Sequence, residues 1–175
     1  MKTRDMPATG GEKEMLQACL DNQRAIVQWK LEGVTPEQGQ STTGASATSL
    51  FGLVKHLSLV ELGWLVNNFL GEEFEHGYDF DADRDAEWRP DPADTAESVL
   101  AGYEAAIARA NQIIADADLD DLASRPLGKD RGHASMRWIL VHMIEETARH
   151  AGHADIMREL VDGERGYLPE NLLLN

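Results

Sequence analysis

The chain has 175 residues, of which 42% are hydrophobic and 27% are charged, so it can bury one core of ordinary size. Its formal net charge of −15, with an isoelectric point near 4.7, argues against a nucleic-acid partner, because binding to phosphates requires a basic surface. No apolar run reaches transmembrane length, and the N-terminus lacks the apolar core of a secretory signal, so we expect no membrane partner. Cys19 is the only cysteine, which excludes an internal disulfide and favours a cytoplasmic location.

Helical periodicity and helix-breaking residues divide the N-terminal half of the chain. Residues 1–10 are expected to form a loose arm, because small polar residues, a proline and a glycine leave no periodic pattern. Over residues 13–32 apolar residues recur at intervals of three and four, which predicts a first helix that ends at Gly33. A short helical turn at 35–37 and a Gly/Ser/Thr connection then precede a second helix, predicted over about 48–70.

The C-terminal half begins with a long acidic and aromatic loop over 71–92, and long loops are often functional. A third helix is predicted from about 94 to 116, followed by a second connection over 118–133. A fourth helix should begin after Ser135 as its N-cap and end near 162, which leaves an irregular tail at 164–175.

The predicted fold class is all-α. Four amphipathic helices of roughly twenty residues indicate a four-helix bundle. The alternation that is typical of strands occurs nowhere in the sequence. The whole chain, residues 1–175, is therefore expected to form a single domain.

The last predicted helix carries polar residues on the face that should be buried. At about 100° per residue, the stretch from Trp138 to Leu160 places one carboxylate and three imidazoles on the same side as its apolar residues. A buried carboxylate is unfavourable unless it is paired or binds a metal ion, so this conflict marks a candidate site. The apolar residues of this face are Ile139, Met143, Met157 and Leu160, and the polar ones are His142, Glu146, His150 and His153.

Three inward polar residues have the arrangement of a metal site. Glu146 and His150 are four residues apart, so their side chains lie on adjacent turns of one helix face. His56 lies on the inward face of the second predicted helix and can supply a third ligand. Three ligands and an open position are typical of catalytic zinc sites, and nickel or iron(II) accept the same ligands. From spacing alone, a hydrogen-bonded core network is the alternative, because structural histidines are common.

The other histidines have less defined roles. His142 and His153 lie on the inward face, where each can act as a general base, orient a ligand, or simply pack. His153 follows His150 by three residues, so it is also an alternative metal ligand. His76 and His133 lie in predicted loops and are expected to face solvent.

The tryptophans and the cysteine are expected to be structural. Trp29, Trp64 and Trp138 lie in predicted helices and should be core residues. For Trp88, packing of the acidic loop onto the helices is favoured over lining an entrance. Cys19 lies on the inward stripe of the first helix and should be a small buried residue rather than a nucleophile.

Two segments carry a resemblance to a known family. They are SLFGLVKHLSLVELGW at 49–64 and RWILVHMIEETARHAGHADIMRELVDG at 137–163, and together they resemble the DinB-like superfamily. The segments LDNQRAIVQWKLEGVTPEQ at 20–38 and DADRDAEWRPDPADTAESV at 81–99 resemble its actinobacterial branch of mini-circle proteins. The resemblance covers about residues 15–163.

The resemblance implies a fold and a ligand set. DinB-like proteins are up-down-down-up four-helix bundles, often homodimers, with a divalent metal ion, zinc or nickel. His56 matches the ligand on their second helix, and His150 matches the last ligand. Glu146 matches a position that is His in many members and Glu in others, including mycothiol-dependent maleylpyruvate isomerase. His153 stands where many members have Gln.

The resemblance also implies a chemistry. Several relatives are transferases or isomerases that use a low-molecular-weight thiol such as mycothiol. The leading hypothesis is a metal-dependent enzyme that activates such a thiol for transfer to a small-molecule electrophile. A metal-dependent hydrolase is the alternative enzyme, and a non-catalytic dimer that binds a metal or a ligand is the alternative outside catalysis.

Overall fold

Long helices make up most of the residues that the computed structural model describes, which are 7–43 and 48–166. Residues 1–6 of the predicted arm, 44–47 of the predicted connection and 167–175 of the predicted tail lie outside the described residues. The elements are α1 (Glu12–Trp29), α2 (Pro36–Gln40), α3 (Leu50–Leu62), the π-helix η1 (Gly63–Leu70), the 3-10 helix η2 (Ala86–Trp88), α4 (Ala96–Asp116), β1 (Leu122–Pro126), β2 (His133–Ser135) and α5 (Met136–Asp162).

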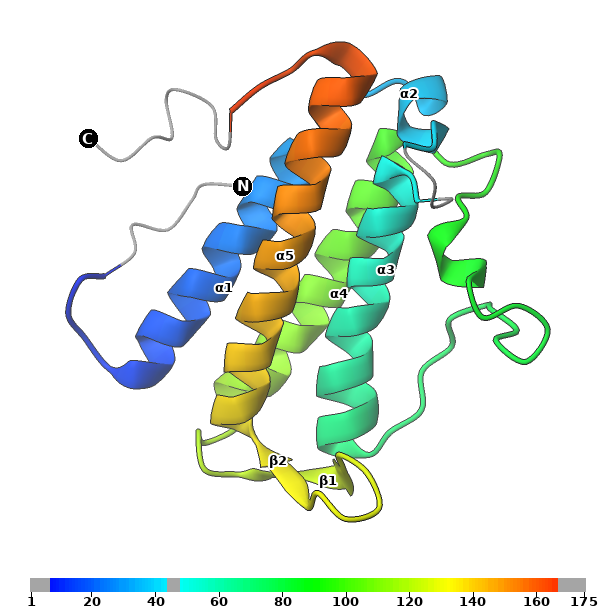
Figure 1. Ribbon diagram of the computed structural model, residues 1–175. Coiled ribbons are helices and arrows are strands. Elements are labelled where there is room, and N and C mark those ends of the chain that lie inside the picture. The colour runs from blue at the N-terminus through cyan, green and yellow to red at the C-terminus, as the bar shows by residue number, and fades with distance from the viewer. Residues whose placement is uncertain (1–6, 44–47, 167–175) are drawn as a thin grey trace.

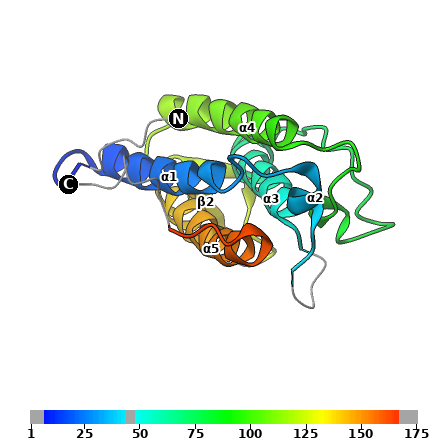
Figure 2. The ribbon, with the colours of Figure 1, turned by 90° about the horizontal axis from the view of Figure 1, so that it is seen from above.

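The four long helices lie lengthwise against one another, and the small sheet lies at one end of them (Figure 1). In this view α1 and α5 run away from the sheet, whereas α3 and α4 run toward it. α5 packs mainly on α1 and also on α3, and α3 packs mainly on α4. Figure 2 shows α4 and α5 on opposite sides of a layer formed by α1 and α3. The contact between α3 and α5 is the one that positions the candidate site.

Capping residues set the helix ends close to the predicted positions. The hydroxyls of Ser49 and Ser135 accept hydrogen bonds from backbone N–H groups three residues later, at the starts of α3 and α5. Thr95 forms a capping box with Ser98 at the start of α4. α5 ends at Asp162, and its C-cap Gly163 has a φ of 79°, in the left-handed region that favours glycine. The predicted second, third and fourth helices are therefore confirmed.

The expectation that the chain contains no strand was wrong. Leu122–Pro126 and His133–Ser135 form an antiparallel pair, with Leu122 opposite Ser135 and Pro126 opposite His133. These strands have five and three residues, too few for an alternating pattern to emerge from the sequence. The predicted second connection therefore folds as a small hairpin that leads directly into α5.

The segment Leu50–Leu70 is the one helix among the described residues that is long and apolar enough to cross a membrane. It has 21 residues and a mean hydropathy of 1.2. By length and composition, the expectation that no apolar run reaches transmembrane length was therefore wrong. Half of its apolar window is buried inside the protein, and the charged Glu61 lies within it. The core helix of a soluble protein passes the same test, so length and composition alone are weak evidence for a membrane span.

A buried ion pair joins α1 to α3. The Arg24 guanidinium donates to both carboxylate oxygens of Glu61 at 2.6 Å, and also to Asp21 and Asn111 at 2.9 Å. The side chains of Arg24 and Glu61 are 0% and 1% exposed. The apolar stripe predicted for the first helix did not include Arg24, so this charged part of the core was not predicted from the sequence.

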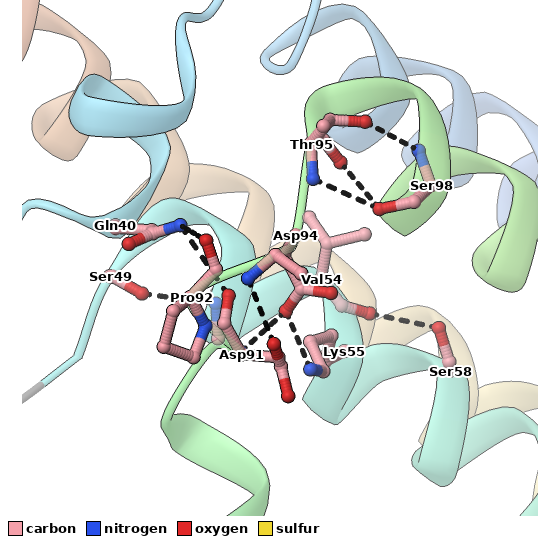
Figure 3. Close-up of polar contacts among 12 residues, drawn as sticks. Gln40, Ser49, Val54, Lys55, Ser58, Asp91, Pro92, Asp94, Thr95 and Ser98 are labelled. Carbon is pink, nitrogen blue, oxygen red and sulfur yellow. Dashed lines mark hydrogen bonds and ion pairs between the residues drawn. The ribbon is translucent and has the colours of Figure 1, made fainter.

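Polar contacts fasten the segment that follows η2 onto α2 and α3 (Figure 3). Lys55 of α3 forms an ion pair with Asp94 at 2.7 Å. Gln40 of α2 donates to the backbone carbonyls of Asp91 and Pro92 at 3.4 and 3.3 Å. η2 itself contacts α3. The end of the long acidic loop is thus held against the second long helix.

Candidate metal centre

Three side chains from two helices meet where α3 packs on α5. His56 comes from α3, and Glu146 and His150 come from α5. One ligand atom from each residue lies within 4.8 Å of the other two. Glu146 Oε1 lies 3.2 Å from Nε2 of His150 and 3.8 Å from Nε2 of His56. The structure therefore brings together the three residues that the sequence singled out as ligands.

The surroundings favour the protonation states in which these groups bind metals. Burial raises the pKa of Glu146, but the attraction of His150, Arg149 and His56 outweighs it, so this pKa lies below its usual value. Burial and repulsion by His56 lower the pKa of His150 and together outweigh the attraction of Glu146. At neutral pH the site therefore holds a carboxylate beside a neutral imidazole, and both groups are ready to bind a metal ion.

The chemistry of the three side chains also suits a metal ion. Nε2 of His150 is the ring nitrogen that lies beside Glu146, at 3.2 Å from its Oε1. A carboxylate and two imidazoles are ligands that zinc, nickel and iron(II) share. The residues present therefore fit a divalent metal ion with three protein ligands.

The turn formed by η2, in the long acidic loop, holds His56. Glu87 Oε1 lies 2.9 Å from Nδ1 of His56, and the Trp88 ring stacks on the His56 ring with centroids 4.0 Å apart. When Nδ1 donates to Glu87, Nε2 keeps its lone pair on the side of Glu146. The sequence did not predict Glu87 in this position, because a loop has no periodicity that places its side chains. The unusual length of the loop was the only signal.

Gly52 allows this turn to approach α3. A Cβ atom added at Gly52 would lie 2.0 Å from the backbone oxygen of Trp88, far inside van der Waals contact. Gly52 precedes His56 by four residues, so both lie on one face of α3. The turn can therefore reach the His56 ring only because position 52 has no side chain.

Gly52→Ala is expected to weaken the site without changing a ligand. The added methyl group must displace the turn that carries Glu87 and Trp88, and loss of such support lowers metal affinity about 10- to 100-fold. Competition for zinc with a chelator measures this loss. Gly102→Ala in α4 is the matched control, because its added Cβ meets no atom within 4 Å. Unchanged zinc affinity in Gly52→Ala would contradict the role given to the turn.

A pocket of about 310 Å³ adjoins the candidate centre at His150. Its wall includes His150 of the candidate centre and Trp88 of the loop. Trp88 packs against the core, in agreement with the interpretation that it packs the loop onto the helices. It also lines this pocket. The lining residues are Thr43, Thr48, Leu53, Trp88, His150, His153, Ile156 and Met157.

The comparison with protein families assigns the chain. A family model described as mycothiol-S-transferase matches residues 15–163. The chain belongs to this family. The mycothiol-S-transferase family is DinB-like, so the DinB-like resemblance is confirmed. No curated protein matches the chain.

The two further histidines that the sequence proposed for the site, His142 and His153, occupy different environments. His153 lines the pocket, and its ring centroid lies 5.4 Å from that of His150. His142 does not line the pocket and instead contacts the rings of Trp64 and Trp138. This position of His142 favours packing, one of the roles that the sequence left open.

Some burial predictions for this family member were wrong. Trp138 is 37% exposed and Leu160 is 68% exposed, although both were expected in the core. Cys19, Trp29 and Trp64 are half-buried rather than buried. His133 is exposed, as expected. None of these corrections concerns the three residues of the candidate centre.

Proposed function

We propose that the chain is a metal-dependent mycothiol S-transferase built as an up-down-down-up four-helix bundle of the DinB-like type. The observation that carries the proposal is the cluster of His56, Glu146 and His150 beside a pocket large enough for a small molecule. The family match supports a small-molecule thiol as one substrate. The opposite directions of α1 and α3 in Figure 1 support the bundle topology.

His56, Glu146 and His150 would hold the ion, and zinc or nickel suit these ligands, as does iron(II). When bound, a divalent cation would lower the pKa of a thiol and so supply a thiolate at neutral pH. In the transfer, the sulfur forms a bond to the electrophilic carbon, and either a leaving group departs or a carbon–carbon π bond opens.

The residues of the chain prepare the site for this step. Glu87 and Trp88 fix the orientation of His56. Arg149 donates to Glu146 at 3.1 Å and keeps that carboxylate ionised and in place. His153, on the pocket wall, is placed to accept the proton that the thiol releases or to return it to the product.

Glu87→Gln is expected to lower zinc affinity about 10- to 100-fold while the fold is kept, because the amide is a weaker acceptor for Nδ1–H of His56. Chelator competition measures the affinity, and the absorption spectrum of the cobalt(II)-loaded protein reports the geometry at the metal. Glu73→Gln is the control, because Glu73 is exposed and pairs with Arg125 at the beginning of the same loop. A Glu87→Gln protein with wild-type affinity and spectrum would contradict the positioning role.

The direct test of the proposed function measures disappearance of mycothiol in the presence of an electrophile, with and without prior removal of the metal ion. The proposal expects catalysed thiol consumption that metal removal abolishes. Thiol-independent cleavage of esters would instead favour the metal-dependent hydrolase, and metal binding without either activity would favour the non-catalytic binding protein. The homodimer, the cytoplasmic location and the single-domain organisation stay predictions from the sequence.

A further inference from the structure

The pocket beside the candidate centre has a mostly apolar wall. Leu53 and Met157 form its buried side, with 0% and 6% exposure. Trp88 supplies an aromatic face, and Ile156, which is 61% exposed, lies at the outer edge. Such a surface favours apolar groups, because each polar group placed against it loses hydrogen bonds to water.

Among the residues that the structure describes, none that lines the pocket is Lys, Arg, Asp or Glu. The carboxylates of Glu146 and Glu87 are engaged with His150 and His56, and a metal ion at these ligands would lie at the His150 end of the pocket. A carboxylate on the part of a ligand that lies against Leu53, Trp88 and Met157 would therefore lose its water without gaining a partner.

The size and wall of the pocket decide which substrate it takes. A volume of about 310 Å³ lies at the lower end of the range for small-molecule pockets, which favours a small group over an extended scaffold. Mycothiol carries its thiol on a sugar–inositol scaffold, whose many hydroxyl groups would stay unpaired against Leu53 and Trp88. Among the described lining residues, the side-chain hydroxyls come from Thr43 and Thr48.

We propose that this pocket binds the electrophilic co-substrate through an uncharged, apolar group the size of a single ring, and that it discriminates against anionic electrophiles. This inference rests on the proposed function, because it assigns the second substrate of the transfer. Trp88 would stack on the ring, and the thiol would approach from the side of His56, Glu146 and His150.

A matched pair of unreactive ligands tests the binding step alone. N-phenylsuccinimide and N-(4-carboxyphenyl)succinimide differ by one carboxylate, and calorimetric titration of the metal-loaded protein measures both affinities. The neutral ligand is expected to bind at least about tenfold tighter, because the carboxylate loses hydration without a partner. Equal affinities, tighter binding of the anion, or no binding of either ligand would overturn the proposal.

A charge placed at the pocket edge should reverse the preference. Ile156→Arg supplies a cation at an exposed position, so the variant should fold and should improve the relative affinity for the carboxylate at least about tenfold. Leu160→Arg is the matched control, because Leu160 lies one turn further along α5, is 68% exposed and does not line the pocket. Identical effects of the two variants would overturn the assignment of the pocket.

The corresponding maleimides separate this inference from the proposed function. With mycothiol, the S–C bond forms, the C=C π bond opens and the proton moves to the neighbouring carbon. Faster catalysed addition to N-phenylmaleimide than to N-(4-carboxyphenyl)maleimide supports both proposals. Equal catalysed rates would overturn the pocket assignment and leave the transferase intact. No catalysed addition, with the binding preference retained, would remove the transferase and leave the pocket as a binding site for neutral rings.

Discussion

His56→Ala is expected to lower kcat/KM for metal-dependent thiol transfer at least about 10³-fold, because a metal ion contributes several kcal/mol to catalysis and 1.4 kcal/mol corresponds to a factor of ten. His56 is the one proposed ligand on α3, so its loss leaves only Glu146 and His150, both on α5. Steady-state rates at saturating zinc measure the effect. The fold should persist, because the other contacts between α3 and α5 remain.

His76→Ala controls for loss of a histidine as such. His76 lies in the same long loop as Glu87, but it is exposed, packs against aromatic rings of that loop and accepts a hydrogen bond from a backbone amide. This variant should keep its zinc affinity and its rate. If His56→Ala retained most of the wild-type rate while His76→Ala lost it, the catalytic centre would lie elsewhere.

Glu61→Ala is expected to lower the free energy of unfolding by about 3 to 5 kcal/mol, because removing one partner of a buried ion pair leaves the other charge uncompensated. Arg24 would lose its two hydrogen bonds of 2.6 Å to Glu61 and would keep those to Asp21 and Asn111. Such a loss is a large share of the stability of a typical domain. Urea denaturation followed by circular dichroism measures it.

Two comparisons sharpen the prediction for the buried pair. Glu61→Gln keeps an acceptor oxygen for Arg24 and should be less destabilising than Glu61→Ala. Glu72→Ala removes an exposed carboxylate that lies 3.5 Å from Arg109 and should change stability by less than about 1 kcal/mol. If Glu61→Ala were no more harmful than Glu72→Ala, the network would have no structural role.

The ligand set was predictable because all three residues lie on regular helices. Periodicity placed Glu146 and His150 on one face of α5, and it placed His56 on the inward face of α3. Polar side chains on a face that also carries core residues such as Met143 are conspicuous in a sequence. The caps Ser49 and Ser135 were predictable for a similar reason, because each acts within a few residues of its own position.

The parts that escaped prediction depend on contacts between segments far apart in the sequence. Glu87 reaches His56 from an irregular loop, and nothing near residue 87 indicates that approach. Gly52 is the position that the turn approaches, but a glycine inside a helix does not by itself identify which segment packs against it. Arg24 is polar in the sequence, and only its pairing with Glu61 makes its burial favourable.

The errors on α5 have a geometric cause. A helical wheel assumes that one stripe faces the core along the whole length of a helix. α5 has 27 residues and packs on α1 and α3, so its remaining side is uncovered. Trp138 near its start and Leu160 near its end therefore remain partly exposed. The wheel was right for Ile139, Met143 and Met157, which are buried.

The central claim is that His56, Glu146 and His150 bind a divalent metal ion. Elemental mass spectrometry of protein purified without chelators tests it most directly, beside a Glu146→Ala/His150→Ala double variant. We predict about one equivalent of zinc, nickel or iron per wild-type chain and a nearly metal-free double variant, because a single remaining histidine cannot hold the ion. Wild-type protein that stays metal-free after reconstitution with each of these ions would contradict the claim.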